Sequence, residues 1–243
     1  MPTLHSIEEV IEQLDAIVAV TRDRGDPAGL FAALYRAVTK RVLDGVLTGA
    51  FDDGPRMVAL DTTFAQRYFD AYHAWRAGAT PPRCWEAALT ATLDPHISPL
   101  QHLLLGINAH ICLDLAIAAA AVAPGDAIES LRGDFDQINE ILAAMIETVQ
   151  EALNDGNPLL RAFDVLLCKA DELAAYFGLL DARDNAWSAA TLLARLEGPS
   201  RQQAIDTLDN QTTSTARLLT AVKPLRRWKP RIRASIQRIA RVQ

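Results

Sequence analysis

The segment Leu100–Val122 constrains the fold most, because it is apolar enough to require burial and yet carries strongly polar side chains. Among them are His102, Asn108, His110 and Asp114. Such groups are costly to bury without hydrogen-bond partners, and a helix that faces lipid tolerates them poorly. The segment is therefore predicted to be the central, buried helix of a globular protein, and we expect no transmembrane segment.

The rest of the chain shows helical periodicity with almost no strand pattern. Ser6 and Glu9 form a predicted capping box before a helix, and Pro27 stands in the first turn of the next one. Further helices are expected at about 57–75, 85–93, 126–153, 159–196 (one or two helices) and 199–222. The pattern predicts an all-α, single-domain bundle of about eight to ten helices around the central apolar helix, spanning 1–222.

Cysteine content and the N-terminus bear on the compartment. The 243 residues include three cysteines, widely spaced and without a Cys-x-x-Cys pair, which favours reduced thiols in the core. Acidic residues stand near the N-terminus, where a signal peptide would have a basic region followed by an apolar run. We therefore expect a cytoplasmic protein.

Charge is distributed unevenly along the chain. The net charge is −6, yet the segment 223–243 holds eight of the 24 basic residues and none of the 30 acidic ones. The favoured interpretation is that this basic C-terminal segment packs on its own acidic body, since opposite charges attract. The alternative is an arm for an anionic partner. We do not expect nucleic acid as this partner, because residues 1–222 are strongly acidic and would repel phosphates.

Four residues of the central segment recur at every fourth position: His102, Gly106, His110 and Asp114. They therefore share one slowly drifting helix face. His110 and Asp114 are close enough for the carboxylate to hold the imidazole in one tautomer, or for both to bind one metal with ligands from other helices. His102 lies roughly 12 Å from His110 along the axis, too far to join a mononuclear site. The predicted catalytic residues are His110, Asp114 and His102.

The candidate binding residues come from three predicted helices. Gly106 has no side chain, so either a ligand or another helix could approach the backbone closely here, and the sequence does not choose between these two interpretations. An ionised Asp114 inside a core needs a cation, for which Arg67, Lys169 and Arg183 are candidates. The alternative is a purely structural ion pair. The residues assigned to substrate binding are Asn108, Gly106, Tyr68, Tyr72, Arg67 and Arg183.

The run 102–115, with the upstream sequence Phe-Ala-Gln-Arg-Tyr-Phe at 64–69 and Ala-Arg-Asp-Asn-Ala-Trp at 182–187, resembles a family of bacterial proteins known as a domain of unknown function. The resemblance extends from the second helix to about residue 196 and implies no activity. A weaker similarity is to zinc-dependent phospholipase C and P1 nuclease, whose helical folds use His-x-x-x-Asp and His-x-x-x-Glu pairs. Only His110 and Asp114 match such a pair.

These observations favour a small-molecule enzyme. Its largely apolar pocket would lie between the central helix and the helices at 57–75 and 164–187. His110, oriented by Asp114, would act as general base or acid in a hydrolysis, an elimination or a cyclisation. The expected ligand is a small, largely apolar organic molecule, and both a divalent metal and a homo-oligomer remain open. The alternative is a non-catalytic ligand-binding or scaffold protein in which the same groups form a structural network.

Overall fold

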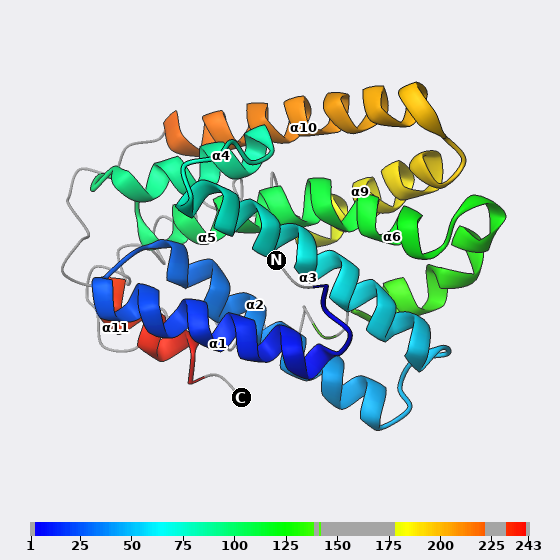
Figure 1. Ribbon diagram of the computed structural model, residues 1–243, viewed down its shortest axis with the longest axis horizontal. Helices are drawn as coiled ribbons and strands as arrows, with labels where there is room; N and C mark the ends of the chain where they lie inside the picture. The colour runs from blue at the N-terminus through cyan, green and yellow to red at the C-terminus, as the bar shows by residue number, and fades with distance from the viewer. Residues whose placement is uncertain (1–2, 139–140, 142–177, 222–231, 242–243) are drawn as a thin grey trace.

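The computed structural model describes residues 3–138, 141, 178–221 and 232–241 (Figure 1). Its helices follow one another in the order α1 (Ile7–Arg24), α2 (Ala28–Leu47), α3 (Gly54–Arg76), α4 (Arg83–Thr90), η1 (Ala91–Leu93), α5 (Pro99–Ala109), η2 (His110–Leu115), α6 (Ala116–Val122), η3 (Gly125–Leu131), α9 (Leu179–Ala194), α10 (Gly198–Ala221) and α11 (Ile232–Ile239).

Local sequence signals set the beginnings and ends of several helices. The Ser6 hydroxyl accepts a hydrogen bond from the Glu9 backbone N–H at the start of α1, which confirms the N-cap half of the predicted capping box. The Glu9 carboxylate accepts from the backbone N–H of His5 and not from that of Ser6. Gly25 ends α1 with a φ of 67°, a left-handed conformation that glycine adopts without steric cost. Ser98 and Gln101 form a complete capping box at the start of α5.

The predicted central helix is present and continuous from Pro99 to Val122, as α5, η2 and α6. By length and composition it could cross a membrane, but 83% of its most apolar window is buried inside the protein. Helices α2, α4 and α10 pack against α5, while α3 and α9 pack against α6. In Figure 1 these helices surround it, and it therefore forms the middle of the hydrophobic core.

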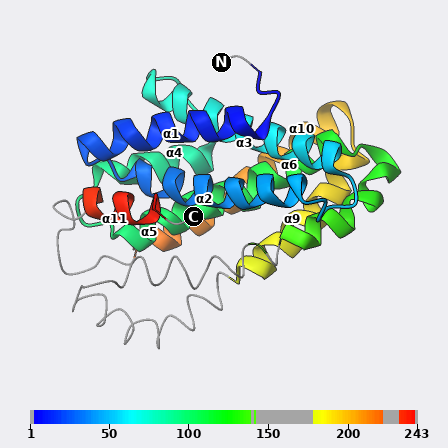
Figure 2. The same cartoon turned by 90° about the horizontal axis from the view of Figure 1, so that it is seen from below.

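Helix α11, from the basic C-terminal segment, packs against α1 and α2 (Figure 2). Its buried face carries Ile232, Ile236 and Ile239. Within the described part of the chain, its arginines Arg233 and Arg238 form no ion pair with an acidic side chain. The described contacts that hold α11 are therefore apolar packing and a hydrogen bond from Arg22 of α1 to Gln237 Oε1 over 3.4 Å, whereas we expected charge attraction. Residues 223–231 lie outside the described residues.

The segment after the central helix differs from the expected helix at 126–153. Residues Gly125–Leu131 form the 3-10 helix η3, and α-helix follows from residue 132 to 138. Gly125 has a φ of 62°, which separates this segment from the central helix. Ile128, Leu131 and Phe135 are nevertheless buried as their periodicity predicted. The rest of that helix, and the part of the helix at 159–196 that precedes residue 178, fall outside the described residues.

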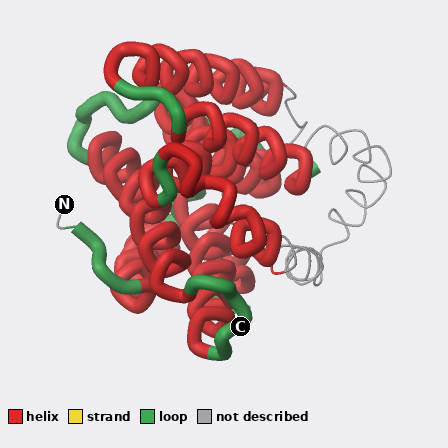
Figure 3. The backbone as a smooth tube through the Cα atoms, turned by 90° about the vertical axis from the view of Figure 1, so that its right-hand side faces the viewer, coloured by secondary structure: helices red, strands yellow, loops and turns green. Residues whose placement is uncertain are grey.

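All regular secondary structure in the described residues is helical (Figure 3). The all-α prediction is therefore confirmed. Cys84 and Cys112 are free thiols, and Cys168 is outside the described residues.

Candidate functional site

The Asp114 carboxylate lies at the centre of the polar cluster that the sequence pointed to. It is fully buried and accepts three hydrogen bonds from three elements. Arg67 Nε of α3 donates to Oδ1 over 2.9 Å. Trp85 Nε1 of α4 and His110 Nδ1 approach Oδ2 at 2.7 and 3.1 Å. Since a buried carboxylate is costly without such partners, these contacts make its burial possible.

The two helices that supply Arg67 and Trp85 are fixed at their first turns. Asp53 caps α3, where its carboxylate accepts a hydrogen bond from the Arg56 backbone N–H. At the start of α4, the backbone N–H groups of Arg83 and Cys84 both donate to the Asp209 carboxylate of α10, at 2.9 Å each. A carboxylate from another helix thus accepts hydrogen bonds from the first backbone N–H groups of α4, and this contact fixes the start of the helix that carries Trp85.

The contact between His110 and Asp114 lies in a π-helical stretch. The element η2 runs from His110 to Leu115, so it begins at His110 and ends one residue after Asp114. π-Helical turns are rare and are found frequently at functional sites. The predicted contact between the two side chains is present, although the local helix is wider than the α-helix from which we predicted it.

The hydrogen bond to Asp114 determines the tautomer of His110. Burial lowers the pKa of His110, against the opposing effect of the Asp114 hydrogen bond, so the imidazole is neutral at neutral pH. A neutral imidazole that bonds a carboxylate through Nδ1 carries its proton there. Its Nε2 therefore has a free lone pair. Nε2 is buried and has no hydrogen-bond partner among the described residues.

Aromatic rings enclose the His110 imidazole. Phe64 stacks on it with ring centroids 3.5 Å apart and an interplanar angle of 8°. Tyr35 meets it edge-on at 4.5 Å, and three further rings lie within about 6 Å, those of Phe31, Tyr68 and Trp85. Tyr35 is buried, but Phe64 is partly exposed. Phe64 therefore covers one face of the imidazole and also reaches the surface.

Three other buried polar atoms near these rings lack a partner among the described residues: Tyr35 Oη, Tyr68 Oη and Asp61 Oδ2. Burial raises the pKa of Asp61 to about 7, so this carboxyl is substantially protonated near neutral pH. Burial, then the charges of Asp61 and Asp114, raise the pKa of Tyr35. Tyr35 thus lies near enough to both acidic side chains to sense their charges. Because buried polar groups are nearly always hydrogen-bonded, these atoms call for water or a ligand.

His102 does not belong to this cluster. It is buried near the start of α5, where it forms a hydrogen bond with the backbone of Ile97 and senses the charge of Asp94. Burial lowers its pKa to about 4. His102 is therefore a neutral core side chain near physiological pH, and the structure does not place it beside His110.

Gly106 and Asn108 face other helices. A Cβ atom on Gly106 would lie 2.4 Å from Phe31 Cγ, so the missing side chain allows close helix packing, the second of the two readings. The Asn108 amide donates to the Thr212 carbonyl of α10 over 2.9 Å, while its Oδ1 has no partner among the described residues. Tyr72 is buried and its ring lies 6.1 Å from that of Tyr68.

Arg183 is not the cation that compensates Asp114. It is buried against Phe135, whose carbonyl accepts a hydrogen bond from Arg183 Nη2 at 2.6 Å and whose ring lies 4.3 Å away. Burial lowers its pKa to about 10. Of the three candidate cations, Arg67 makes the ion pair and Lys169 lies outside the described residues.

Sequence comparison places the chain in a family. The model of DUF5995, a family of unknown function, matches residues 7–222. The chain belongs to DUF5995. No curated protein and no solved structure matches it, so the similarity to zinc-dependent phospholipase C and P1 nuclease gains no support.

The described residues of this DUF5995 protein contain no group of three or more His, Cys, Asp or Glu side chains placed to hold a metal ion. In addition, the nitrogen of His110 nearest Asp114 is engaged by the carboxylate, and Arg67 places a positive charge beside it. At this pair, therefore, His110 Nδ1 and both carboxylate oxygens of Asp114 are engaged by protein groups.

Sequence reasoning missed four members of the cluster in this DUF5995 protein: Phe31, Tyr35, Phe64 and Trp85. Their positions fit the apolar faces of their helices, where an aromatic residue is usually interpreted as core. Trp85 carried one usable signal, because a buried indole N–H needs an acceptor. Asp114 is the acceptor that this N–H finds, although the sequence suggested only basic side chains as its partners.

Proposed function

We propose that this protein is an enzyme that acts on a small, largely apolar organic molecule by acid–base chemistry, with His110 as the general base. The observation that carries the proposal is the state of its two ring nitrogens. Nδ1 is held by Asp114, while Nε2 is buried, unprotonated and without a partner among the described residues. A base in this state is ready to accept a proton from a ligand that reaches it.

Asp114 would orient His110 and stabilise the imidazolium that forms when the base takes up a proton. A carboxylate at Nδ1 serves this purpose in catalytic histidines generally. Arg67 and Trp85 fix the carboxylate in turn. Such support matters because a catalytic group must keep its orientation within narrow limits.

Asp61 is the proposed proton donor, acting with Tyr35. Its pKa of about 7 keeps a proton available near neutral pH, and its Oδ2 is buried without a partner among the described residues. An acid and a base whose environments hold them in opposite protonation states are the usual signature of acid–base catalysis. The reaction class is proton abstraction with proton return, as in an elimination, a cyclisation or a hydrolysis.

The test is the incubation of a metabolite extract with the purified protein, in ordinary water and in D2O, followed by untargeted mass spectrometry. We expect at least one metabolite to be consumed or to gain deuterium with the wild type and not with His110→Gln. His73→Gln is the control, since His73 is an exposed histidine of α3. Identical spectra for the wild type and His110→Gln would contradict the proposal.

The second candidate function is the non-catalytic one, a binding or scaffold protein. It is favoured by the close packing of Phe31 on Gly106 and of Phe64 on His110. In that case the extract would show a metabolite retained by the protein, or none, without conversion. The stability of His110 variants would then be the property that changes.

A further inference from the structure

Arg67 crosses the boundary between the core and the surface. Its Nε is bonded to the fully buried Asp114, yet 28% of its side chain remains exposed. A guanidinium has five N–H donors, and this contact uses one of them. Its Nη1 and Nη2 groups have no hydrogen bond or ion pair with any described residue.

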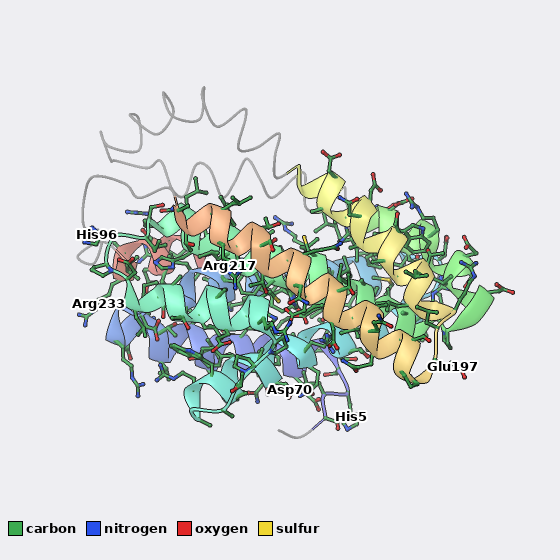
Figure 4. The ribbon with its side chains drawn as sticks, turned by 90° about the horizontal axis from the view of Figure 1, so that it is seen from above. His5, Asp70, His96, Glu197, Arg217 and Arg233 are labelled. Atoms are coloured by element: carbon green, nitrogen blue, oxygen red, sulfur yellow. The ribbon has the colours of Figure 1, made fainter. Side chains whose placement is uncertain are left out.

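The free part of the guanidinium has the shape that carboxylates bind. Its Nη1 and Nη2 groups form an edge that can donate two parallel hydrogen bonds to one carboxylate. The nearest acid along α3, Asp70, does not occupy this edge. Asp70 is exposed at the edge of the molecule and accepts a hydrogen bond from Gln66 over 2.9 Å (Figure 4).

The same arginine lies beside the proposed base. Arg67 and His110 bind the two oxygens of one carboxylate, and the positive charge of Arg67 contributes to lowering the pKa of His110. Phe64 stands three residues before Arg67 on α3, so the two side chains are neighbours on the helix surface. Phe64 in turn stacks on His110. A ligand held by the outer edge of Arg67 would thus have an apolar ring within reach.

We propose that Arg67 binds a carboxylate of the substrate end-on, with the apolar body of that molecule against Phe64 next to His110. The inference rests on the proposed function and narrows the substrate class from a small apolar molecule to a small organic carboxylic acid. Asp114 then has two roles, because it orients the base through one oxygen and the substrate-binding arginine through the other.

The chain offers a matched control for this arginine. Arg76 lies on the same helix, is exposed to a similar extent at 32%, and pairs with Asp26 at 3.2 Å. It has no contact with Asp114 or His110 among the described residues. Arg67→Lys and Arg76→Lys both keep the positive charge and remove the planar guanidinium, so the two variants differ only in where the arginine was replaced.

The experiment measures binding of benzoate, benzamide and inorganic phosphate by calorimetry, and follows the ring resonances of His110 and His73 by NMR. We expect millimolar binding of benzoate, with shifts at His110 and none at His73, and at least about fivefold weaker binding of benzamide and phosphate. Arg67→Lys should weaken benzoate binding about tenfold and Arg76→Lys by less than twofold. Far-ultraviolet circular dichroism checks that each variant folds.

Equal binding of benzoate and benzamide, or equal binding to the wild type and Arg67→Lys, overturns the inference. So does phosphate binding as tight as that of benzoate, because charge alone would then explain the site. If Arg67→Lys does not fold, the comparison of the three probes and the His110 resonances in the wild type still decides.

The outcome is separable from that of the proposed function. Benzoate binding at Arg67 without any converted metabolite leaves the carboxylate site standing and refutes the enzyme. If a metabolite is converted and Arg67→Lys does not change that conversion, the enzyme proposal stands and the carboxylate site is refuted. His110→Gln should retain benzoate binding within about threefold, since Arg67 supplies the anchoring contacts.

Discussion

The replacement Asp114→Ala tests how much of the fold depends on one buried carboxylate. The change leaves the N–H groups of Trp85 and His110 without an acceptor, and both residues are at most 2% exposed. An unsatisfied buried donor costs about 1–3 kcal/mol. Arg67 is 28% exposed and can recover water, so it adds little. The expected loss in the free energy of unfolding is roughly 2–6 kcal/mol.

Urea unfolding followed by tryptophan fluorescence and circular dichroism measures this loss at pH 7. The control is Asp23→Ala, because Asp23 pairs with Arg22 on the surface and the two side chains are 70% and 40% exposed. Such exposed pairs contribute at most about 1 kcal/mol. A loss for Asp114→Ala that is no larger than that of Asp23→Ala would refute the reasoning that the two buried donors depend on this carboxylate.

Three further predictions concern single residues. Because burial raises the pKa of Asp61 to about 7, the folded wild type should lose stability as the pH rises from 4 to 7. Asp61→Asn should therefore stabilise the protein by up to roughly 4 kcal/mol at pH 8 and have little effect near pH 4, as measured by urea unfolding. Gly106→Ala should lower the free energy of unfolding by about 1–3 kcal/mol, because its new Cβ meets Phe31, and the double variant with Phe31→Ala should lose less than the sum of the two single variants. The control is Gly54→Ala, whose Cβ would lie 3.8 Å from Val46; additive losses in urea unfolding would contradict the assigned contact. His110→Phe should keep the unfolding free energy within about 1 kcal/mol of the wild type, since it removes the unpartnered Nε2 and leaves Asp114 with two donors; a larger loss would mean that the imidazole is needed for stability.

Most of the fold could be predicted because its signals are local. Ser6 and Ser98, with their capping partners, mark the starts of two helices. The apolar run that follows Ser98 is longer than a β-strand usually is, so its length favours a helix. The π-helical stretch at His110 was not predictable, since the residues of η2 also fit an α-helix. The 3-10 helix after Gly125 was missed for the same reason, because its apolar spacing also fits an α-helix.

The candidate site was predictable only in part. Spacing placed four residues on one helix face, but it does not state which element packs opposite each of them. The structure separates them: His102 contacts the backbone of Ile97, Gly106 receives Phe31, and His110 and Asp114 remain together. The sequence could not choose among three cations for Asp114. That choice depends on the crossing of α3 over the central helix, which brings Arg67 to the carboxylate.

The contrast between Asp114 and its neighbours supports a ligand site over a structural network. A network kept for stability would satisfy all of its members, because each unpartnered buried group costs free energy. Asp114 is satisfied by three donors, whereas His110 Nε2, Tyr35 Oη and Asp61 Oδ2 have no partner among the described residues. In the proposed enzyme, the complete half of the cluster would orient His110 and Arg67, and the incomplete half would consist of the groups that meet a substrate. Such a division fits a site that sacrifices stability for binding and proton transfer.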